Sequence, residues 1–409
     1  MKKIMTNGYW LFFLLFPFFN PNALRYIPGL TVIYSLIQIW KLIACCTIIA
    51  LYLFRGKLSK IVLLILLWEF ISIGTSLLNG VSDLRPVTNA LMVISLAMMT
   101  ELSVKYNVVK YYRILLKIIS TLVLINLILC VLYPFGLEMA SLYTNTKNPM
   151  YFLGIDNGMV SNLIPFLFLI CLLVFCDKNS NKGVGVFIVA SLISVITIVI
   201  VGSATGLFVL IVNITFTVFF TILQKRKIPY RIALIVYCIF FVLVIVLQSS
   251  NFIVLIITEL LGRSGTFTGR SLLWAAALEE IARRPLLGYG YTGGNIAIWG
   301  GAYSSHNMFL EMMIQGGVLY FAVFIIITYV AIKRINKGSV ALGNTLFSGI
   351  YCFLLNGLME TGVSEIYFIF IVLAYYAKSV KIQLEEINKL QTVARGDFYV
   401  ENECGNPSI

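Results

Sequence analysis

An all-α integral membrane protein with about twelve transmembrane helices is the architecture that this sequence predicts. Of its 409 residues, 60% are hydrophobic and only 11% are charged, whereas soluble domains are about 45–50% apolar and about 25% charged. Apolar runs recur along the chain, and each is about long enough to cross a bilayer core of roughly 30 Å as a helix. Short basic clusters occupy every second connection between the runs. This pattern places those connections and both termini in the cytoplasm.

The predicted spans follow the apolar runs in order. The first segment, "MKKIMTNGYWLFFLLFPFF", lacks a small-residue cleavage site, so we expect it to be retained as the first helix. Residues 202–206, with two glycines, supply a tight turn between two helices that no basic cluster separates. The twelve spans are expected at residues 9–20, 33–54, 61–78, 87–104, 115–135, 157–176, 184–202, 205–223, 232–250, 306–332, 340–358 and 363–377.

These spans divide the chain into four parts. Nine helices occupy residues 1–250, an external catalytic loop 251–305, three helices 306–377, and a cytoplasmic tail 378–409. The net charge of +13 follows the alternation of connections rather than one surface, so we expect no nucleic-acid partner. The eight cysteines have no metal-ligand spacing and are interpreted as small apolar residues.

The external loop contains four arginines, which oppose the charge rule that sets topology. Arg263 and Arg270 flank the turn "GRSGTFTGR", whose backbone N–H groups and guanidinium forks suit a phosphate or pyrophosphate. Arg283 and Arg284 end an amphipathic helix, where they bind substrate or simply cap the helix. Trp274 shares a helix face with Arg270. It either lies beside a bound sugar or belongs to the aromatic belt at the membrane interface.

The next stretch, "PLLGYGYTGGN", matches G-x-G-x-x-G at Gly288, Gly290 and Gly293. A dinucleotide-binding turn needs a strand before it and a helix after it, and this stretch follows a predicted helix. We therefore expect the glycines to allow a close, irregular backbone over a cleft. Aromatic and amide side chains that suit a sugar or a membrane-interface loop follow, namely Tyr289, Tyr291, Asn295, Trp299 and Tyr303.

His306 is the only histidine in the chain, and it lies at the predicted external edge of the membrane. Imidazole is the side chain best able to accept a proton near neutral pH, although a structural hydrogen-bonding role is the alternative. We expect Asn307 to bind a hydroxyl or to orient the ring, and Glu360, which faces the same side, is a further candidate to orient it. Arg85 and Lys147 add cationic contacts or are ordinary loop charges.

Two charged residues, Lys41 and Glu69, fall inside consecutive predicted helices. Ionisable groups within a membrane are usually functional or paired. A structural ion pair between them is the simpler interpretation.

The segments "TGRSLLWAAALEEIARRPLLGYGYTGGN" and "SSHNMFLEMMIQGGVLY" resemble the O-antigen ligase and O-antigen polymerase superfamily over roughly residues 262–320. That pattern has an Arg and a Trp opening a loop helix, a Pro followed by a Gly-x-Gly turn, and a His-Asn pair before a helix with Gly-Gly. The matching residues here are Arg270, Trp274, Pro285, Gly288, Gly290, His306, Asn307, Gly316 and Gly317.

The resemblance implies a glycosyltransferase similar in fold to the membrane C-type enzymes, with a glycan on undecaprenyl pyrophosphate as donor and a sugar hydroxyl as acceptor. It also implies inversion at the anomeric carbon. Arg270 and Arg263 would stabilise the leaving pyrophosphate, and His306 would accept the hydroxyl proton. We expect no cofactor and no metal ion, because the external acids form no recognisable ligand set. The substrate-binding candidates are Asn307, Trp274, Tyr289, Tyr291, Asn295, Arg85, Lys147 and Arg284.

Within this class, the sequence favours a polymerase of capsular or O-antigen repeat units in the bacterial cytoplasmic membrane, with its active site on the outer face. A ligase that transfers finished polysaccharide to an acceptor is the nearest alternative. An exporter of polysaccharide or lipid would carry charges through the bundle, and a scaffold would not need His306 together with the arginines. A flippase and a chain-length regulator are candidate protein partners.

Overall fold

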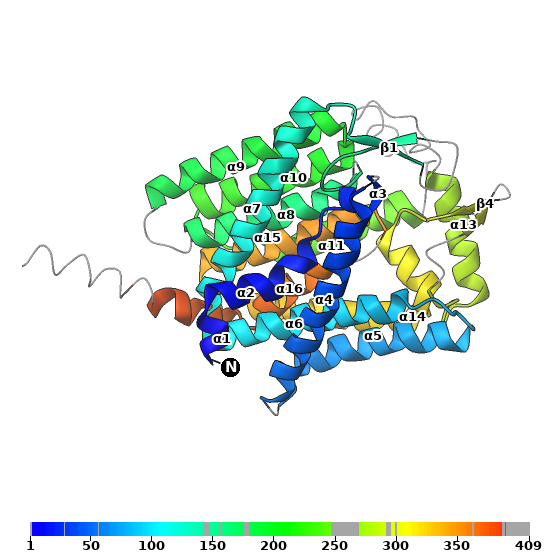
Figure 1. Cartoon of the computed structure of the whole chain (residues 1–409), viewed down its shortest axis with the longest axis horizontal. Coiled ribbons are helices and arrows are strands. Elements are labelled where there is room, and N and C mark those ends of the chain that lie inside the picture. The colour runs from blue at the N-terminus through cyan, green and yellow to red at the C-terminus, as the bar shows by residue number, and fades with distance from the viewer. Residues whose placement is uncertain are drawn as a thin grey trace, which may run out of the picture.

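The computed structural model describes residues 2–27, 29–55, 57–141, 147–155, 157–175, 180–246, 270–291, 296–298, 301–361, 364–386 and 389. These residues are mostly helical, with two short antiparallel hairpins, β1–β2 and β3–β4. The helices pack lengthwise into one bundle, and α13 and β4 lie together at one end of it (Figure 1).

The first half of the chain is helical except for its connections. Its elements are α1 Lys2–Thr6, α2 Gly8–Leu15, η1 Phe16–Phe19, α3 Ala23–Tyr26, α4 Thr31–Leu53, α5 Lys60–Leu78, α6 Arg85–Tyr106 and α7 Val108–Leu132. Short polar side chains fix several helix starts, because their oxygens accept from the free N–H groups of the first turn. Asn7, Ser59 and Asn107 do this for α2, α5 and α7.

The second half begins with β1 Glu138–Ser141 and β2 Lys147–Met150 and then returns to helices. These are η2 Asn157–Met159, α8 Val160–Phe175, α9 Ser180–Val201, α10 Ala204–Phe216, the π-helical η3 Thr217–Leu223, α11 Tyr230–Phe241 and the π-helical η4 Val242–Val246. The last elements are α13 Arg270–Arg283, β3 Ile296–Ile298, β4 Gly301–Tyr303, α14 Met308–Ile335, α15 Val340–Gly357 and α16 Glu365–Tyr375.

Seven of the described helices are long and apolar enough to cross a membrane, as judged by length and composition. They are Thr31–Leu53, Lys60–Leu78, Arg85–Tyr106, Val108–Leu132, Gly183–Val201, Ala204–Leu223 and Met308–Ile335. Five shorter apolar helices occupy the remaining predicted spans, at Gly8–Phe19, Val160–Phe175, Tyr230–Phe241, Val340–Asn356 and Glu365–Tyr375. The chain is therefore a multi-pass helical membrane protein. The count of twelve spans and the cytoplasmic placement of both termini stay predictions.

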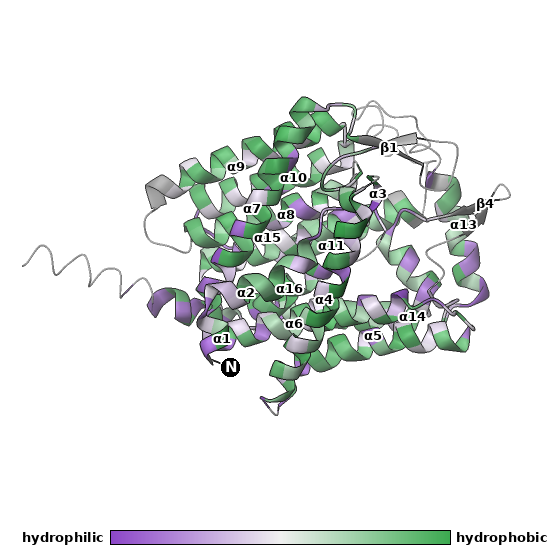
Figure 2. Ribbon diagram, viewed as in Figure 1, coloured by the Kyte–Doolittle hydropathy of each residue, from purple (hydrophilic) through white to green (hydrophobic). Residues whose placement is uncertain are grey.

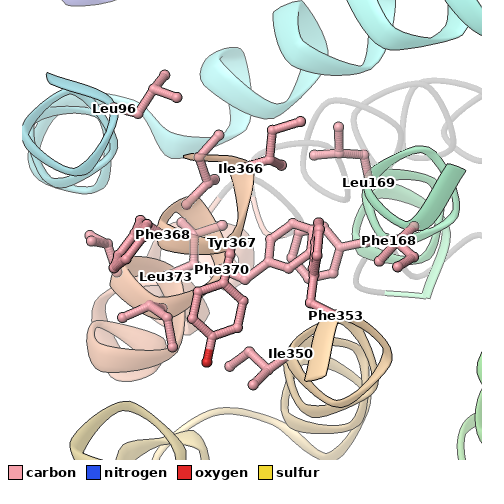
Figure 3. Packing of buried hydrophobic residues seen from close by; sticks show 14 of the residues in the cluster. Leu96, Phe168, Leu169, Ile350, Phe353, Ile366, Tyr367, Phe368, Phe370 and Leu373 are labelled. Carbon is pink, nitrogen blue, oxygen red and sulfur yellow. The ribbon is translucent and has the colours of Figure 1, made fainter. Parts of the chain in front are cut away.

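Helix α16 lies at the centre of the bundle, where residues 366–375 are all buried. It packs against α6, α14 and α15, and its aromatic residues interlock with Phe168 of α8 and Phe353 of α15 (Figure 3). Large apolar side chains instead stay exposed along α4, α9 and α11, and hydrophobic residues make up most of the length of these and other helices (Figure 2). Such continuous exposed apolar surface is typical of helices that face lipid.

The prediction that Lys41 and Glu69 form an ion pair is wrong. No salt bridge joins these two described residues. Lys41 interacts electrostatically with Glu365 of α16, while Glu69 is buried in α5. Adjacency in sequence does not make two helices present their charges to each other, and the acid that acts on Lys41 comes from α16.

Candidate functional site

The loop helix α13 is held against the beginning of α14. Trp274, Ala277 and Ile281 recur at helical spacing and form one buried cluster with Leu310 and Ile314 of α14. Trp274 is 0% exposed, and its indole N–H donates to the carbonyl oxygen of Ser305 at 3.0 Å. The indole therefore contacts the backbone that leads into His306, which fixes the loop helix and this turn relative to each other.

His306 occupies a strained turn between β4 and α14. Its φ angle is +49°, which is uncommon for a residue other than glycine. Its backbone N–H donates to Ser304 Oγ at 3.2 Å, and its side chain is partly buried. A residue held in this region costs about 1–3 kcal/mol and persists only where its surroundings enforce it.

Asn307 is one of the groups that enforce the turn. Its side-chain oxygen accepts from the N–H groups of Phe309 and Leu310, each at 3.0 Å. Its amide nitrogen donates to the carbonyl oxygen of Leu358 at 3.0 Å. Asn307 is thus the N-cap of α14 and ties this helix to the end of α15. Direct contact of Asn307 with a substrate hydroxyl stays a prediction.

Glu311 is a second group that holds the turn, and no role is expected for it from the sequence. Only 4% of this residue is exposed. One carboxylate oxygen, Oε1, accepts from Ser304 Oγ at 3.1 Å, from Ser305 N–H at 2.9 Å and from Ser305 Oγ at 3.0 Å. The signal in the sequence is an acidic residue in the first turn of an otherwise apolar helix.

Arg270, at the start of α13, lies near the acid that follows α15. Its guanidinium is 3.4 Å from Glu360 Oε1, and the two side chains are 17% and 18% exposed. The pair keeps a guanidinium in place at the same end of the bundle as the His306 turn. Glu360 pairs with Arg270 in the structure, and its expected role in orienting His306 stays a prediction.

The glycine-rich loop packs into a break in α14. Gly317 has a φ of +64° inside that helix, so neighbouring backbone groups lose their helical partners. The loop replaces them: Tyr289 N–H donates to Ile314 O and Gly290 N–H to Gln315 O, while Val318 N–H donates to Pro285 O, each at 2.8 Å. Backbone groups in a membrane must find partners within the protein. The close, irregular backbone expected here is present, and its partner is a broken helix.

Four predicted residues, from the start of α6 and from the segment after α13, gather beside this loop. Arg284 donates to the side-chain oxygen of Asn79 at 2.7 Å, and its guanidinium lies 4.8 Å from the ring centre of Tyr289. Arg85 lies 5.2 Å from the ring centre of Tyr291. These arginines and tyrosines therefore form a single cationic and aromatic rim.

Two acids, Asp83 and Glu280, bind side chains of this rim. Arg85 forms an ion pair with Asp83, and its hydrogen bonds lower the pKa of that carboxyl. The Tyr289 hydroxyl donates to Glu280 Oε2 at 2.7 Å. Partial burial, reinforced by Glu280, raises the pKa of Tyr289. The tyrosine therefore stays a hydrogen-bond donor at neutral pH.

Two neighbouring cavities lie near the His306 turn, and the glycine-rich loop lines the first of them through Tyr291. One of about 220 Å³ is lined from α5, α6, α14 and α16, and one of about 270 Å³ from α8, α15 and α16. They share Met308, Thr361 and Glu365 as lining residues. The shared lining makes them neighbours, and both reach residues next to the His306 turn along the chain.

Six predicted residues are placed only in part or not at all. Arg263, Gly293, Asn295 and Trp299 lie outside the described residues, and only the backbones of Lys147, in β2, and Tyr303, in β4, are described. Within the described ranges, no group of three or more His, Cys, Asp or Glu side chains is arranged to hold a metal ion.

Comparison with known proteins identifies one family. The model of the O-antigen ligase family matches residues 189–325. The matched stretch contains α13, the glycine-rich loop, the His306 turn and more than half of α14. The match confirms the resemblance to the O-antigen ligase and polymerase superfamily and supports a role in polysaccharide biosynthesis. No curated protein matches the chain.

Proposed function

We propose, from the O-antigen ligase family match in a multi-pass membrane chain, that this protein is a glycosyltransferase that polymerises lipid-linked oligosaccharide repeat units. The donor is a glycan on undecaprenyl pyrophosphate, and the product is a capsular or O-antigen polysaccharide. The reaction takes place on the outer face of the bacterial cytoplasmic membrane. A ligase that moves finished polysaccharide from the carrier to an acceptor would use the same chemistry.

The observation that carries this proposal is that several buried side chains hydrogen-bond to the His306 turn. Asn307, Glu311 and Trp274 are all buried, and each is hydrogen-bonded to this turn or to the helix start that follows it. A strained backbone conformation that its surroundings hold this firmly supports a functional role for the residue. Because His306 is the only histidine of the chain, the role best supported is that of a proton acceptor.

The proposed reaction is a single displacement. His306, in its neutral form, accepts the proton of the acceptor hydroxyl, and the hydroxyl oxygen attacks the anomeric carbon of the donor sugar. The bond between that carbon and the pyrophosphate oxygen breaks, and undecaprenyl pyrophosphate leaves with the electron pair. One displacement inverts the anomeric carbon. The products are a glycan extended by the donor chain and the free carrier.

The arginines stabilise the leaving group in this scheme. Negative charge develops on the pyrophosphate oxygen as the bond breaks, and preorganised cations near that oxygen lower the barrier. Arg270 is positioned for this role by Glu360, and Arg263 is expected to join it. Guanidinium groups supply in this way the charge that a metal ion supplies in other phosphoryl leaving-group sites, so we propose a metal-independent reaction.

Deletion of the gene separates the candidate functions. A polymerase is indicated by single repeat units that accumulate on the lipid carrier or at the cell surface. Long polymer that stays on the carrier would indicate a ligase, and glycan retained at the cytoplasmic face would indicate an exporter. Unchanged surface polysaccharide in the deletion strain would contradict all three, and turnover of a purified lipid-linked repeat unit by the purified protein would confirm the transferase.

A further inference from the structure

The smaller of the two cavities is lined by carboxyl groups from three helices. Glu69 comes from α5, Glu311 from α14 and Glu365 from α16, and the amides of Asn89 and Gln315 lie beside them. Among the lining residues that the structure describes, none is a lysine or an arginine. The described part of its polar surface therefore offers hydrogen-bond acceptors and amides, and the Arg85 guanidinium that lies on the Tyr291 ring is paired with Asp83.

Aromatic rings form another part of its wall. Trp68 of α5 and Tyr320 of α14 are stacked, with ring centres 4.5 Å apart and an interplanar angle of 6°. Tyr291 of the glycine-rich loop lines the same cavity. Flat aromatic faces beside a few placed polar groups are the usual composition of a small-molecule site, and aromatic faces suit the C–H surface of a sugar ring.

Glu311 provides a second observation that points to a ligand. Its Oε1 atom is fully engaged with Ser304 and Ser305. Its Oε2 atom is buried and has no hydrogen-bond partner in the part of the chain that the structure describes. Leaving a buried polar atom without a partner costs about 1–3 kcal/mol, and Glu311 lines the cavity. A ligand hydroxyl in the cavity would remove that cost.

We propose that this cavity is the acceptor-sugar subsite, and that it selects a neutral or amino-bearing sugar ring and rejects an anionic one. This proposal rests on the transferase function and names the chemistry of its acceptor. A volume of about 220 Å³ lies below the roughly 300–1,000 Å³ of sites for drug-sized ligands, so the subsite fits a single ring.

Glu311 connects this subsite to the His306 turn. One oxygen of its carboxylate holds Ser304 and Ser305 next to His306, and the other accepts from a hydroxyl of the bound sugar. The acceptor ring and the proton acceptor are then positioned by the same side chain. The anionic pyrophosphate of the donor belongs with Arg270, whose partner Glu360 lines the neighbouring cavity.

Steady-state kinetics on the purified full-length protein tests the subsite. The donor is the lipid-linked repeat unit, and the acceptor is the same oligosaccharide released from its carrier by mild acid. A second acceptor is this oligosaccharide with its primary hydroxyls oxidised to carboxylates. We expect the wild type to show a KM at least tenfold higher for the oxidised acceptor, because its carboxylates meet the carboxyl groups of Glu69, Glu311 and Glu365.

Two substitutions localise the effect. Glu311→Gln should raise the KM for the neutral acceptor several-fold, reduce the discrimination against the oxidised one, and leave the donor KM unchanged. Glu69→Gln should act in the same direction, and it does not touch the His306 turn, so it covers the case in which Glu311→Gln fails to fold. Glu279→Gln, on the exposed side of α13, is the matched control and should change nothing.

Binding of both oligosaccharides by equilibrium dialysis keeps the subsite testable apart from turnover. If the wild type binds the neutral oligosaccharide more tightly than the oxidised one, and both glutamine variants reduce this difference, the subsite is supported. That support holds even if the wild type transfers no sugar, and the lack of transfer would contradict only the proposed function. Equal affinity of the wild type for both oligosaccharides would overturn the subsite. Unaltered affinity and discrimination in both variants would overturn it as well.

Discussion

Gly288 is the position at which the contact between the loop and α14 can be tested most directly. Its φ is +62°, and a Cβ atom there would lie 2.3 Å from Ile314 O and 2.8 Å from Gln315 C. Both are backbone atoms of α14 and have little freedom to move. In Gly288→Ala, the loop must therefore separate from the helix break that it covers.

The size of the effect follows from two broken hydrogen bonds and one strained residue. Separation breaks the bonds from Tyr289 N–H to Ile314 O and from Gly290 N–H to Gln315 O, each worth about 0.5–1.5 kcal/mol. Alanine in the left-handed region adds about 1–2 kcal/mol, so the total is about 2–5 kcal/mol. Gly80 is a matched control, because its φ is +67° and nothing lies within 4 Å of its Cβ position. Gly80→Ala should cost only the backbone term of about 1–2 kcal/mol.

Thermal exposure of buried cysteines measures this difference. Cys45, Cys130, Cys171 and Cys352 are buried, so a thiol-reactive fluorophore reports unfolding when the detergent-solubilised protein is heated. Gly288→Ala should unfold at a clearly lower temperature than Gly80→Ala, which should lie closer to the wild type. Equal unfolding temperatures for the two variants would refute the argument that the loop is locked onto α14.

Three further predictions address the reaction and its orientation. Arg270→Lys should lose most activity at a normal protein level, because an ammonium cannot replace the bidentate guanidinium fork. The control Arg283→Lys, at a side chain that is 65% exposed, should keep its activity. Full activity of Arg270→Ala would remove Arg270 from the mechanism. His306→Ala should lose about 10²–10⁴-fold in turnover, and the wild-type rate should rise with pH through the ordinary histidine range near about 6.5, because the base must be unprotonated. Near-wild-type turnover by His306→Gln would leave only a structural role. A cysteine at position 295 of a cysteine-free protein should react with an impermeant reagent on intact cells, and reaction only after permeabilisation would place the loop inside.

The positions of the helices follow largely from composition, and their ends follow from local chemistry that composition does not show. The span expected at 61–78 is observed at Lys60–Leu78, where Ser59 caps the helix. The span expected at 115–135 is observed at Val108–Leu132, capped by Asn107. The basic residues in 108–117 look like a connection, yet Lys and Arg are good helix formers, and their long side chains reach water from the helix ends.

The residues of the site were foreseeable by type, and their partners were not. The spacing of Arg270 and Trp274 places them on one helix face, but it does not say that the indole is buried against α14 and bonded to Ser305. The position of Asn307 before an apolar run is also compatible with a plain N-cap, which is what its oxygen forms. The role of Glu311 depends on the direction of its carboxylate, and no spacing rule gives that direction.

The glycines show how the parts of the site depend on one another. Gly288 and Gly290 in the loop and Gly317 in α14 look like separate motifs in the sequence, but they form one contact, since a Cβ at Gly317 would lie 2.2 Å from Leu286 O. This contact fixes the end of α13 to α14, and Trp274 and Glu311 fix the His306 turn to α13 and α14. The helix that carries Arg270 and the turn that carries His306 are therefore both held in place by contacts with the first half of α14. A break in α14 without its loop would disturb both proposed catalytic groups together.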